Sequence, residues 1–225
     1  MSGVSPRCPA SPMIVEVGAV RGENEGMSDI DGDLAACAES HARLHQTLQE
    51  IDDQTVRAPS RLPGWTVGHV LTHLARNADS VVRRLAAAAA GELVDQYPGG
   101  PAGRAAEIEA GHGRSAAEII ADLVAADHAV DAAFAGAAPG VWQRTVRAGN
   151  GELIPATQLL FSRWREVEVH HADLGLGYGW QQWPDGLVAR WLPILLGELA
   201  GRTDERALMA WTLGRAPVPE LRPWG

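Results

Sequence analysis

The sequence predicts an all-α protein built around four long helices. In four segments the apolar and small residues recur at intervals of three and four, which is the period of an amphipathic helix. Only one short segment alternates polar and apolar residues as a strand does, and the sequence contains no internal repeat. With 225 residues, 46% of them hydrophobic, the chain can bury a core as one domain or as one domain with a small appendage.

The first 26 residues are expected to lie outside this fold. They contain Pro, Gly and Glu, and their longest apolar run, Met13–Val15, ends at Glu16, so they hold no signal-peptide core. Met27, followed by Ser and Asp, resembles a natural start. We therefore expect residues 1–26 to be a disordered leader. No window of the sequence reaches transmembrane length.

The first two predicted helices flank a turn. Residues 30–51 carry apolar and small residues at helical spacing, and residues 59–64, rich in Pro and Gly, predict a turn. Thr66 is expected to cap a second helix that ends near Ala90. The core face of this helix is predicted to consist of Val67, Val70, Leu71, Leu74, Ala78, Val81, Val82 and Leu85.

A long irregular connection is expected after the second helix. Residues 91–113 hold six glycines and two prolines, and loops of that length are often functional. Ser115 is predicted to begin a third helix that ends near Phe134. Residues 141–154, with alternating side chains around Asn150-Gly151, predict a short hairpin.

The fourth predicted helix begins at Pro155 and ends near Leu174. Gly175, Gly177 and Gly179 follow it, and because this G-x-G-x-G comes after a helix rather than a strand, it predicts a helix end and not a dinucleotide-binding loop. Amphipathic stretches at 184–199 and 204–214 precede a proline-rich tail. Residues 179–225 are therefore predicted to form a short helical extension.

Charge and cysteine content exclude several classes of protein. The chain has 28 acidic and 19 basic side chains, a net charge of -9, and no basic stripe, so a nucleic-acid partner is not expected. Every basic side chain is an arginine, which excludes lysine Schiff-base chemistry. Cys8 and Cys37 cannot form a disulfide framework or a CxxC site. A reducing cytoplasmic location is expected.

Glu166 and His170 lie four residues apart in a segment otherwise typical of a buried helix. An unpaired polar group in such a place is costly or neutralises itself, so the pair indicates a compensating partner, and a metal ion is the first candidate. On a helical wheel the two side chains lie about 40° apart near the core face, whereas the neighbouring Glu168 and His171 point elsewhere. The alternative is an ordinary i, i+4 hydrogen bond, with Arg163 neutralising the carboxylate.

The second helix offers a third ligand. His73 flanks the apolar stripe, one turn from Asn77, whereas His69 falls nearly opposite that stripe. Two histidines and one glutamate suit Zn and leave a fourth position for water or substrate, which is typical of a catalytic site. Four other histidines are interpreted as surface residues or satisfied partners: His41, His45, His112 and His128.

Two motifs resemble those of a known family. Residues 62–78, LPGWTVGHVLTHLARNA, together with residues 165–175, REVEVHHADLG, resemble the mycothiol-dependent maleylpyruvate isomerase family of the DinB-like metalloenzymes. Residues 97–111 also look like the central loop of that family, and the resemblance covers roughly residues 28–225. It implies a DinB-like up-down four-helix bundle over residues 28–178 that holds a divalent metal, usually zinc, on His73, Glu166 and His170.

The resemblance also implies a reaction. Mycothiol would bind the metal as a thiolate, add to an activated cis double bond, allow rotation and then be eliminated to give the trans isomer. The substrate carries two carboxylates, and Arg104, which matches a loop arginine of the family, is the expected clamp, its alternative being a solvated loop residue. Arg163 is expected to support Glu166, and Asn77 to support His73.

The C-terminal part departs from the family pattern. Family isomerases carry a small α/β domain there, whereas this chain has only about 45 residues after Gly179, and Ala210 stands about where a family arginine would fall. Three hypotheses follow: an isomerase of this type, a mycothiol S-transferase acting on another electrophile, and a non-catalytic metal-binding bundle. The resemblance implies a small-molecule electrophile or dicarboxylate and mycothiol as partners, with no membrane partner.

The source and the assembly are less constrained by the sequence. Abundant Ala and Gly and the absence of lysine are compatible with an actinobacterial source, the group in which mycothiol occurs. The oligomeric state, monomer or homodimer, is left open.

Overall fold

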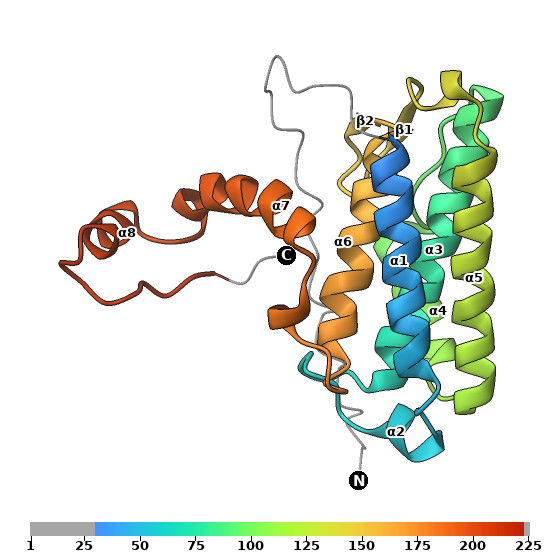
Figure 1. Ribbon diagram of the computed structural model, residues 1–225, viewed down its shortest axis with the longest axis horizontal. Helices are drawn as coiled ribbons and strands as arrows, with labels where there is room; N and C mark the ends of the chain where they lie inside the picture. The colour runs from blue at the N-terminus through green and yellow to red at the C-terminus, as the bar shows by residue number, and fades with distance from the viewer. Residues whose placement is uncertain (1–29, 223–225) are drawn as a thin grey trace, which may run out of the picture.

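Four long helices form a bundle. They are α1 (Ile30–Leu48), α3 (Val67–Ala90), α5 (Ala116–Gly136) and α6 (Gln158–Asp173). In Figure 1 α1 and α6 run downward, whereas α3 and α5 run upward. Helices α1 and α3 each pack against both α5 and α6. The expected all-α bundle is therefore confirmed, although successive helices do not strictly alternate in direction.

The computed structural model describes residues 30–222. The predicted leader, residues 1–26 with Cys8, lies outside the described residues. Within the described range, no helix is long and apolar enough to cross a membrane. Cys37 is buried and has a free thiol.

A short helix that the sequence did not predict lies between the first two long ones. Helix α1 ends at Leu48, three residues earlier than expected, and α2 (Asp53–Arg57) follows. The side chain of Asp52 accepts a hydrogen bond from the backbone N–H of Thr55 and so caps α2. Thr66 caps α3 as expected, because its side chain accepts from the N–H of His69.

The connection between α3 and α5 was expected to be irregular, but it contains α4 (Gly100–Gly111). Its glycines and prolines allow a helix to form here instead of a flexible loop. Gly99 adopts φ 72° at the N-cap, and Pro101 occupies the first turn, where its missing N–H costs nothing. A Cβ atom on Gly103 would lie 1.8 Å from the carbonyl oxygen of Pro98, so only glycine fits there. Helix α4 packs against α3.

The predicted hairpin is present and shorter than expected. Strands β1 (Thr145–Arg147) and β2 (Leu153–Pro155) pair antiparallel, with Val146 opposite Ile154. Gly151 adopts φ 87° in the turn. Because Pro155 belongs to β2, α6 begins three residues after the predicted start. Two of the three glycines after α6 adopt a left-handed backbone conformation: Gly175 and Gly177 have φ of 74° and 95°.

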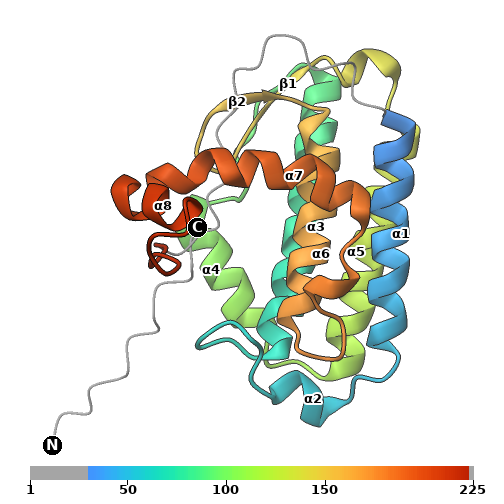
Figure 2. The same cartoon turned by 60° about the vertical axis from the view of Figure 1, so that its left-hand side comes forward.

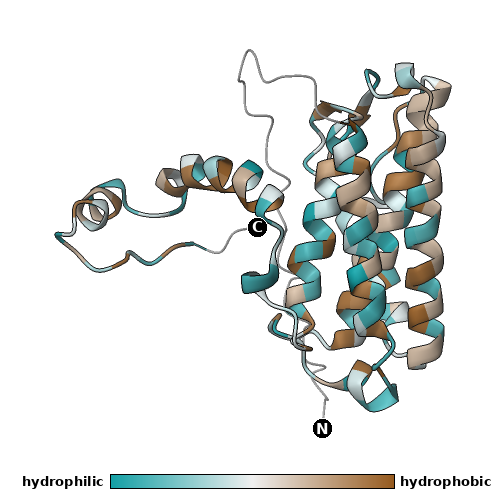
Figure 3. Ribbon diagram, viewed as in Figure 1, coloured by the Kyte–Doolittle hydropathy of each residue, from teal (hydrophilic) through white to brown (hydrophobic). Residues whose placement is uncertain are grey.

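The C-terminal extension is helical, and no strand follows β2 up to residue 222. It contains α7 (Asp185–Glu198) and α8 (Glu205–Thr212). Leu187 and Trp191 of α7 are buried, whereas α8 has no buried residue. Figures 1 and 2 show the extension projecting from the bundle as an arm, and Figure 3 shows brown, hydrophobic residues along it. Its exposed apolar side chains include Val188, Leu192, Leu196, Met209 and Leu213.

A buried guanidinium joins all four helices of the bundle. Arg163 of α6 is fully buried and pairs with Asp127 of α5. Its Nη1 donates to Oδ1 of Asn77, at 2.8 Å, and to the carbonyl oxygen of Leu74, at 3.0 Å, both on α3. Its Nε donates to Nε2 of His41 on α1, at 3.2 Å. A buried charge is tolerated only when it is paired and hydrogen-bonded in this way.

We predict that Asp127→Asn destabilises the fold by about 3–5 kcal/mol, because Arg163 would keep a buried charge without its counterion. Urea unfolding at pH 7 measures this change. Asp131→Asn is the matched control, since Asp131 is one-third exposed and contacts Nδ1 of His41, the ring nitrogen that does not face Arg163. Its expected cost is about 1 kcal/mol, and equal costs for the two variants would contradict the account.

The same pair predicts an acid-sensitive step. Burial acts to raise the pKa of Asp127, but the charge of Arg163 and the hydrogen bond from His45 outweigh it and lower that pKa. A carboxyl group with a lowered pKa contributes full stability above its unfolded pKa, about 3.9, and loses it as the pH falls through the folded value. Asp127→Asn should therefore weaken the decline of stability below pH 4.

Candidate metal centre

Three side chains converge between α3 and α6. His73 extends from α3, and Glu166 and His170 extend from successive turns of α6. Nε2 of His73 lies 3.2 Å from Oε2 of Glu166, and Nε2 of His170 lies 3.6 Å from the same oxygen. The three side chains are at most 9% exposed. The structure therefore brings together the three residues that the sequence singled out.

The spacing of these atoms fits a divalent metal. Zinc bonds of about 2.0–2.2 Å in a tetrahedral arrangement separate two ligand atoms by about 3.4 Å. The two observed separations, 3.2 and 3.6 Å, lie on either side of this value. Nε2 of His170 is buried and has no hydrogen-bond partner among residues 30–222. A metal ion would satisfy this nitrogen.

Asp173 orients His170. Its Oδ2 lies 2.9 Å from Nδ1 of His170, so the imidazole donates from Nδ1 and turns Nε2 toward Glu166. Histidines that bind metals commonly donate their other ring N–H to a carboxylate in this way. No role was predicted for Asp173 from the sequence. Its position three residues after His170 was the available signal.

The two histidines of the cluster stabilise the buried charge of Glu166. Burial acts to raise the pKa of Glu166, but contacts with His170 and His73 outweigh it and lower that pKa well below its usual value. Burial lowers the pKa of His73 to about 3. Burial also acts to lower the pKa of His170, but Asp173 and Glu166 outweigh it and raise that pKa to about 9. Metal binding would therefore displace a proton from His170.

Arg104 points at this cluster from α4 rather than from a loop. Its Nη2 lies 3.1 Å from Nδ1 of His73, and its guanidinium lies 5.8 Å from the ring centres of both Trp65 and Tyr97. A guanidinium only donates, so this contact requires Nδ1 to accept. Coordination through Nε2 requires the other tautomer, with the proton on Nδ1. Arg104 and a metal ion therefore compete for His73.

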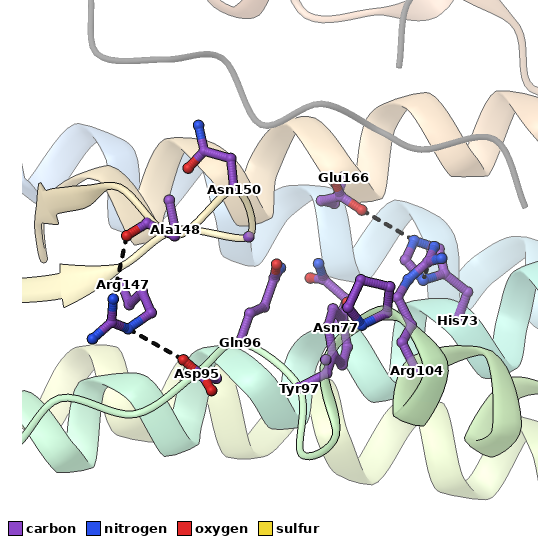
Figure 4. A pocket seen from close by; sticks show the side chains of 14 residues that line it. His73, Asn77, Asp95, Gln96, Tyr97, Arg104, Arg147, Ala148, Asn150 and Glu166 are labelled. Carbon is purple, nitrogen blue, oxygen red and sulfur yellow. Dashed lines mark hydrogen bonds and ion pairs between the residues drawn. The ribbon is translucent and has the colours of Figure 1, made fainter.

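A cavity of about 370 Å³ lies beside the cluster. Its walls come from α3, the segment before α4, the first turn of α4, the hairpin turn and α6. Figure 4 shows His73 and Arg104 on one side of it, and Arg147 and Asp95 on the other. Arg147 Nε lies 3.2 Å from Oδ1 of Asp95. A second guanidinium therefore borders the same cavity.

Two supporting roles predicted from the sequence are wrong. Arg163 does not support Glu166, because it turns into the bundle and pairs with Asp127. Asn77 lines the cavity, but its Oδ1 accepts a hydrogen bond from Arg163. The side chain that contacts Nδ1 of His73 is Arg104 and not Asn77. The helical wheel gave the right face for both residues but could not show which neighbouring helix supplies the partner.

His69, which was predicted to fall nearly opposite the apolar stripe of α3, is nevertheless buried. Its side chain is only 9% exposed, and its ring stacks on that of His112 with centres 3.6 Å apart. The helical wheel indicated one buried face of α3, whereas in the structure α4 covers a second face of this helix. Glu168 and His171 lie away from the cluster, as expected. Glu168 accepts from Ser40 and Tyr178, and His171 stacks on Tyr178 at 3.9 Å.

The remaining histidines lie apart from the cluster around Glu166. His41 is buried and contacts Asp131, at 2.9 Å, and Arg163. Nε2 of His45 lies 2.9 Å from Oδ2 of Asp127. His128 is exposed.

Comparisons with known proteins agree with this architecture. Residues 37–175 match the model of the family described as mycothiol maleylpyruvate isomerase N-terminal domain. A crystal structure of the mycothiol-dependent maleylpyruvate isomerase aligns with a TM-score of 0.68 and 24% identity. The alignment covers 71% of this chain and 66% of that one, and a mutant of the same enzyme gives the same values. This chain therefore spans less than two thirds of the length of that isomerase.

A more distant structure was also found. YfiT from Bacillus subtilis, described as a probable metal-dependent hydrolase with an unusual four-helix bundle topology, aligns with a TM-score of 0.46 and 19% identity. That alignment covers 80% of this chain and 96% of YfiT. No curated protein matches the sequence.

We predict that Asp173→Asn weakens metal binding about 10–100-fold, because His170 would lose the carboxylate that fixes its tautomer. Competition with a chromophoric chelator measures the affinity. Asp185→Asn, at the exposed start of α7, is the control and should leave it unchanged. Unchanged affinity in Asp173→Asn would contradict the role assigned to this carboxylate.

Proposed function

Because the chain belongs to the family of mycothiol maleylpyruvate isomerase N-terminal domains, we propose that it is a metal-dependent, mycothiol-dependent enzyme of the isomerase type. Its metal ligands are His73, Glu166 and His170, and zinc is the favoured ion. Two imidazoles and one carboxylate form a set that suits zinc and leaves a position for a further ligand.

One observation carries this proposal: three potential metal ligands lie together, and two of them, His73 and Glu166, line one cavity with Arg104. A structural zinc site is normally closed by four protein ligands, whereas three ligands beside a cavity are typical of a catalytic site. The cavity volume of about 370 Å³ is within the range of small-molecule sites. A metal that served only to stabilise the bundle would need neither the cavity nor Arg104.

The proposed chemistry is reversible addition of a thiol. A bound divalent metal would lower the pKa of the mycothiol thiol and so supply a thiolate at neutral pH. The sulfur forms a bond to one carbon of a cis double bond, and the π electrons move onto the conjugated carbonyl group. The resulting single bond rotates. When those electrons return, the carbon–sulfur bond breaks and the trans double bond forms, so the thiol is regenerated.

Arg104 is the residue proposed to bind the substrate. It forms no ion pair with a carboxylate among residues 30–222, so its planar set of donors is available to an anionic substrate. Its positive charge would also stabilise the negative charge that moves onto the substrate carbonyl. The guanidinium lies 5.8 Å from the ring centres of Trp65 and Tyr97, within the range of cation–π contacts.

Arg147 is a second anion-binding candidate on the far side of the cavity. It is paired with Asp95, but the two side chains are 36% and 76% exposed. Exposed pairs of this kind contribute about 0–1 kcal/mol, so a substrate carboxylate can compete with Asp95. The cavity therefore suits a substrate with two anionic groups, such as a dicarboxylate.

A mycothiol S-transferase is the second candidate. The residues that line the cavity end at Glu166, so the C-terminal arm, which contains Ala210, contributes none of them. The family resemblance implies that an isomerase has a substrate-binding arginine in its C-terminal part. The arm of this chain supplies no such residue to the cavity. A transferase needs only the first half of the reaction, in which the thiol stays attached to the electrophile. The third candidate, a non-catalytic metal-binding bundle, predicts no thiol turnover.

A spectrophotometric assay of maleylpyruvate with and without mycothiol tests the proposal. We expect mycothiol-dependent conversion to the trans isomer by the zinc-loaded protein, and a loss of at least about 100-fold in His73→Ala, because one ligand of the metal is removed. Consumption of mycothiol in proportion to product would instead identify the transferase. If the protein binds zinc but neither isomerises maleylpyruvate nor consumes mycothiol, only the non-catalytic bundle is left.

We further predict that Arg104→Gln raises the KM for maleylpyruvate about 10–100-fold, since a charge-assisted hydrogen bond contributes about 1.5–3 kcal/mol. Steady-state kinetics at saturating mycothiol measure the change. Arg206→Gln, an exposed arginine on α8, should leave KM unchanged. If both variants behave like the wild type, Arg104 does not bind the substrate.

A further inference from the structure

A second group of potential metal ligands lies where α4 ends against the start of α3. His69 comes from the first turn of α3, Glu109 from the last turn of α4, and His112 from the C-cap of α4. One ligand atom from each lies within 4.8 Å of the other two. We propose that these three residues form a second binding site for a divalent metal such as zinc, separate from the cluster around Glu166.

The distances within this group favour an ion over hydrogen bonds. Nε2 of His69 lies 3.6 Å from Oε1 of Glu109, and Nε2 of His112 lies 3.6 Å from Oε2. Both separations are too long for N–H···O hydrogen bonds, which span about 2.7–3.2 Å. They are close to the spacing of about 3.4 Å between two ligands of tetrahedral zinc. Glu109 thus presents one oxygen to each imidazole with room for an ion.

The backbone brings the two helices unusually close at this point. A Cβ atom on Gly68 would lie 2.5 Å from the carbonyl oxygen of His112. Because this position is glycine, the end of α4 can sit directly on the first turn of α3. His112 is thereby placed over His69, and the pair Glu109 and His112, three residues apart, faces α3 from one side of α4.

Thr66 orients the ring of His69 for metal binding, and the ring of His112 can turn toward the same ion. Oγ1 of Thr66 lies 2.8 Å from Nδ1 of His69 and can accept the proton that a metal-binding imidazole carries there. In the other tautomer the same nitrogen accepts a hydrogen bond from the backbone N–H of Thr66, at 3.1 Å. The two rings are stacked, 17° apart in plane, so a shared ion requires the His112 ring to turn. Its side chain is 31% exposed and has room to do so.

The chemistry of the group indicates which ion it would take. Two imidazoles with one carboxylate favour zinc over calcium or magnesium, which prefer oxygen ligands. Glu109 is 53% exposed, so water can complete the coordination. An ion here would fasten the end of α4 to α3. Since α4 also carries Arg104, this second site would hold the helix that presents the substrate clamp.

Zinc stoichiometry after equilibrium dialysis tests the proposal. The wild type should bind two zinc ions per chain, and His112→Ala, Glu109→Gln and His73→Ala one each. The double variant His73→Ala/His112→Ala should bind none. His128→Ala, an exposed histidine outside both groups, is the matched control and should retain two. Circular dichroism checks that each variant remains folded.

The outcomes separate this site from the proposed catalytic one. One zinc in the wild type, with none in His73→Ala and one in His112→Ala, would overturn the second site and leave the first intact. Loss of zinc from His128→Ala equal to that from His112→Ala would show adventitious surface binding and also overturn it. In the His73→Ala variant, zinc should slow amide hydrogen exchange in residues 105–112 at least about 10-fold, and unchanged exchange would contradict the fastening of α4.

Discussion

The buried guanidinium of Arg163 is the constraint on which the rest of the structure depends. It contacts His41 of α1, Asn77 and Leu74 of α3, and Asp127 of α5, so a shift of any of these helices along its axis would break a contact of a buried charge. Its bond to Asn77 joins α3 to α6 one helical turn from the place where His73 meets Glu166. The same contact that holds the bundle together therefore sets the register of the proposed metal ligands.

Helix α4 adds the second element of the site. The bundle alone would place three potential ligands at the boundary between α3 and α6, but it would leave them without a substrate-binding group. The chain returns along α3 as α4, and the tight packing of Gly103 on Pro98 fixes the start of this helix. Arg104, the next residue, is thereby directed at His73 between the rings of Trp65 and Tyr97. The proposed metal site and the proposed anion-binding arginine thus depend on different parts of the chain.

Much of this architecture could be predicted from the sequence, because the features that determine it are local. The cap at Thr66, the apolar stripe of α3 and the four-residue spacing of Glu166 and His170 are all local patterns, and each appears in the structure. Helix α4 could not be predicted in this way. Its glycines serve close packing and a left-handed cap, whereas composition alone makes the same residues look like a loop. The partners of Arg163, Asn77 and His69 depend on the neighbouring helix, which periodicity within one helix does not reveal.

The proposed chemistry requires that His73, Glu166 and His170 together hold a metal ion. X-ray absorption at the zinc edge of the His112→Ala variant, loaded with one zinc per chain, tests it most directly, because the second proposed site is removed. We expect two imidazole nitrogens and oxygen atoms as the ligands of zinc, and a loss of bound zinc when His73→Ala is added. Zinc that stays bound with an unchanged spectrum in the double variant would contradict it.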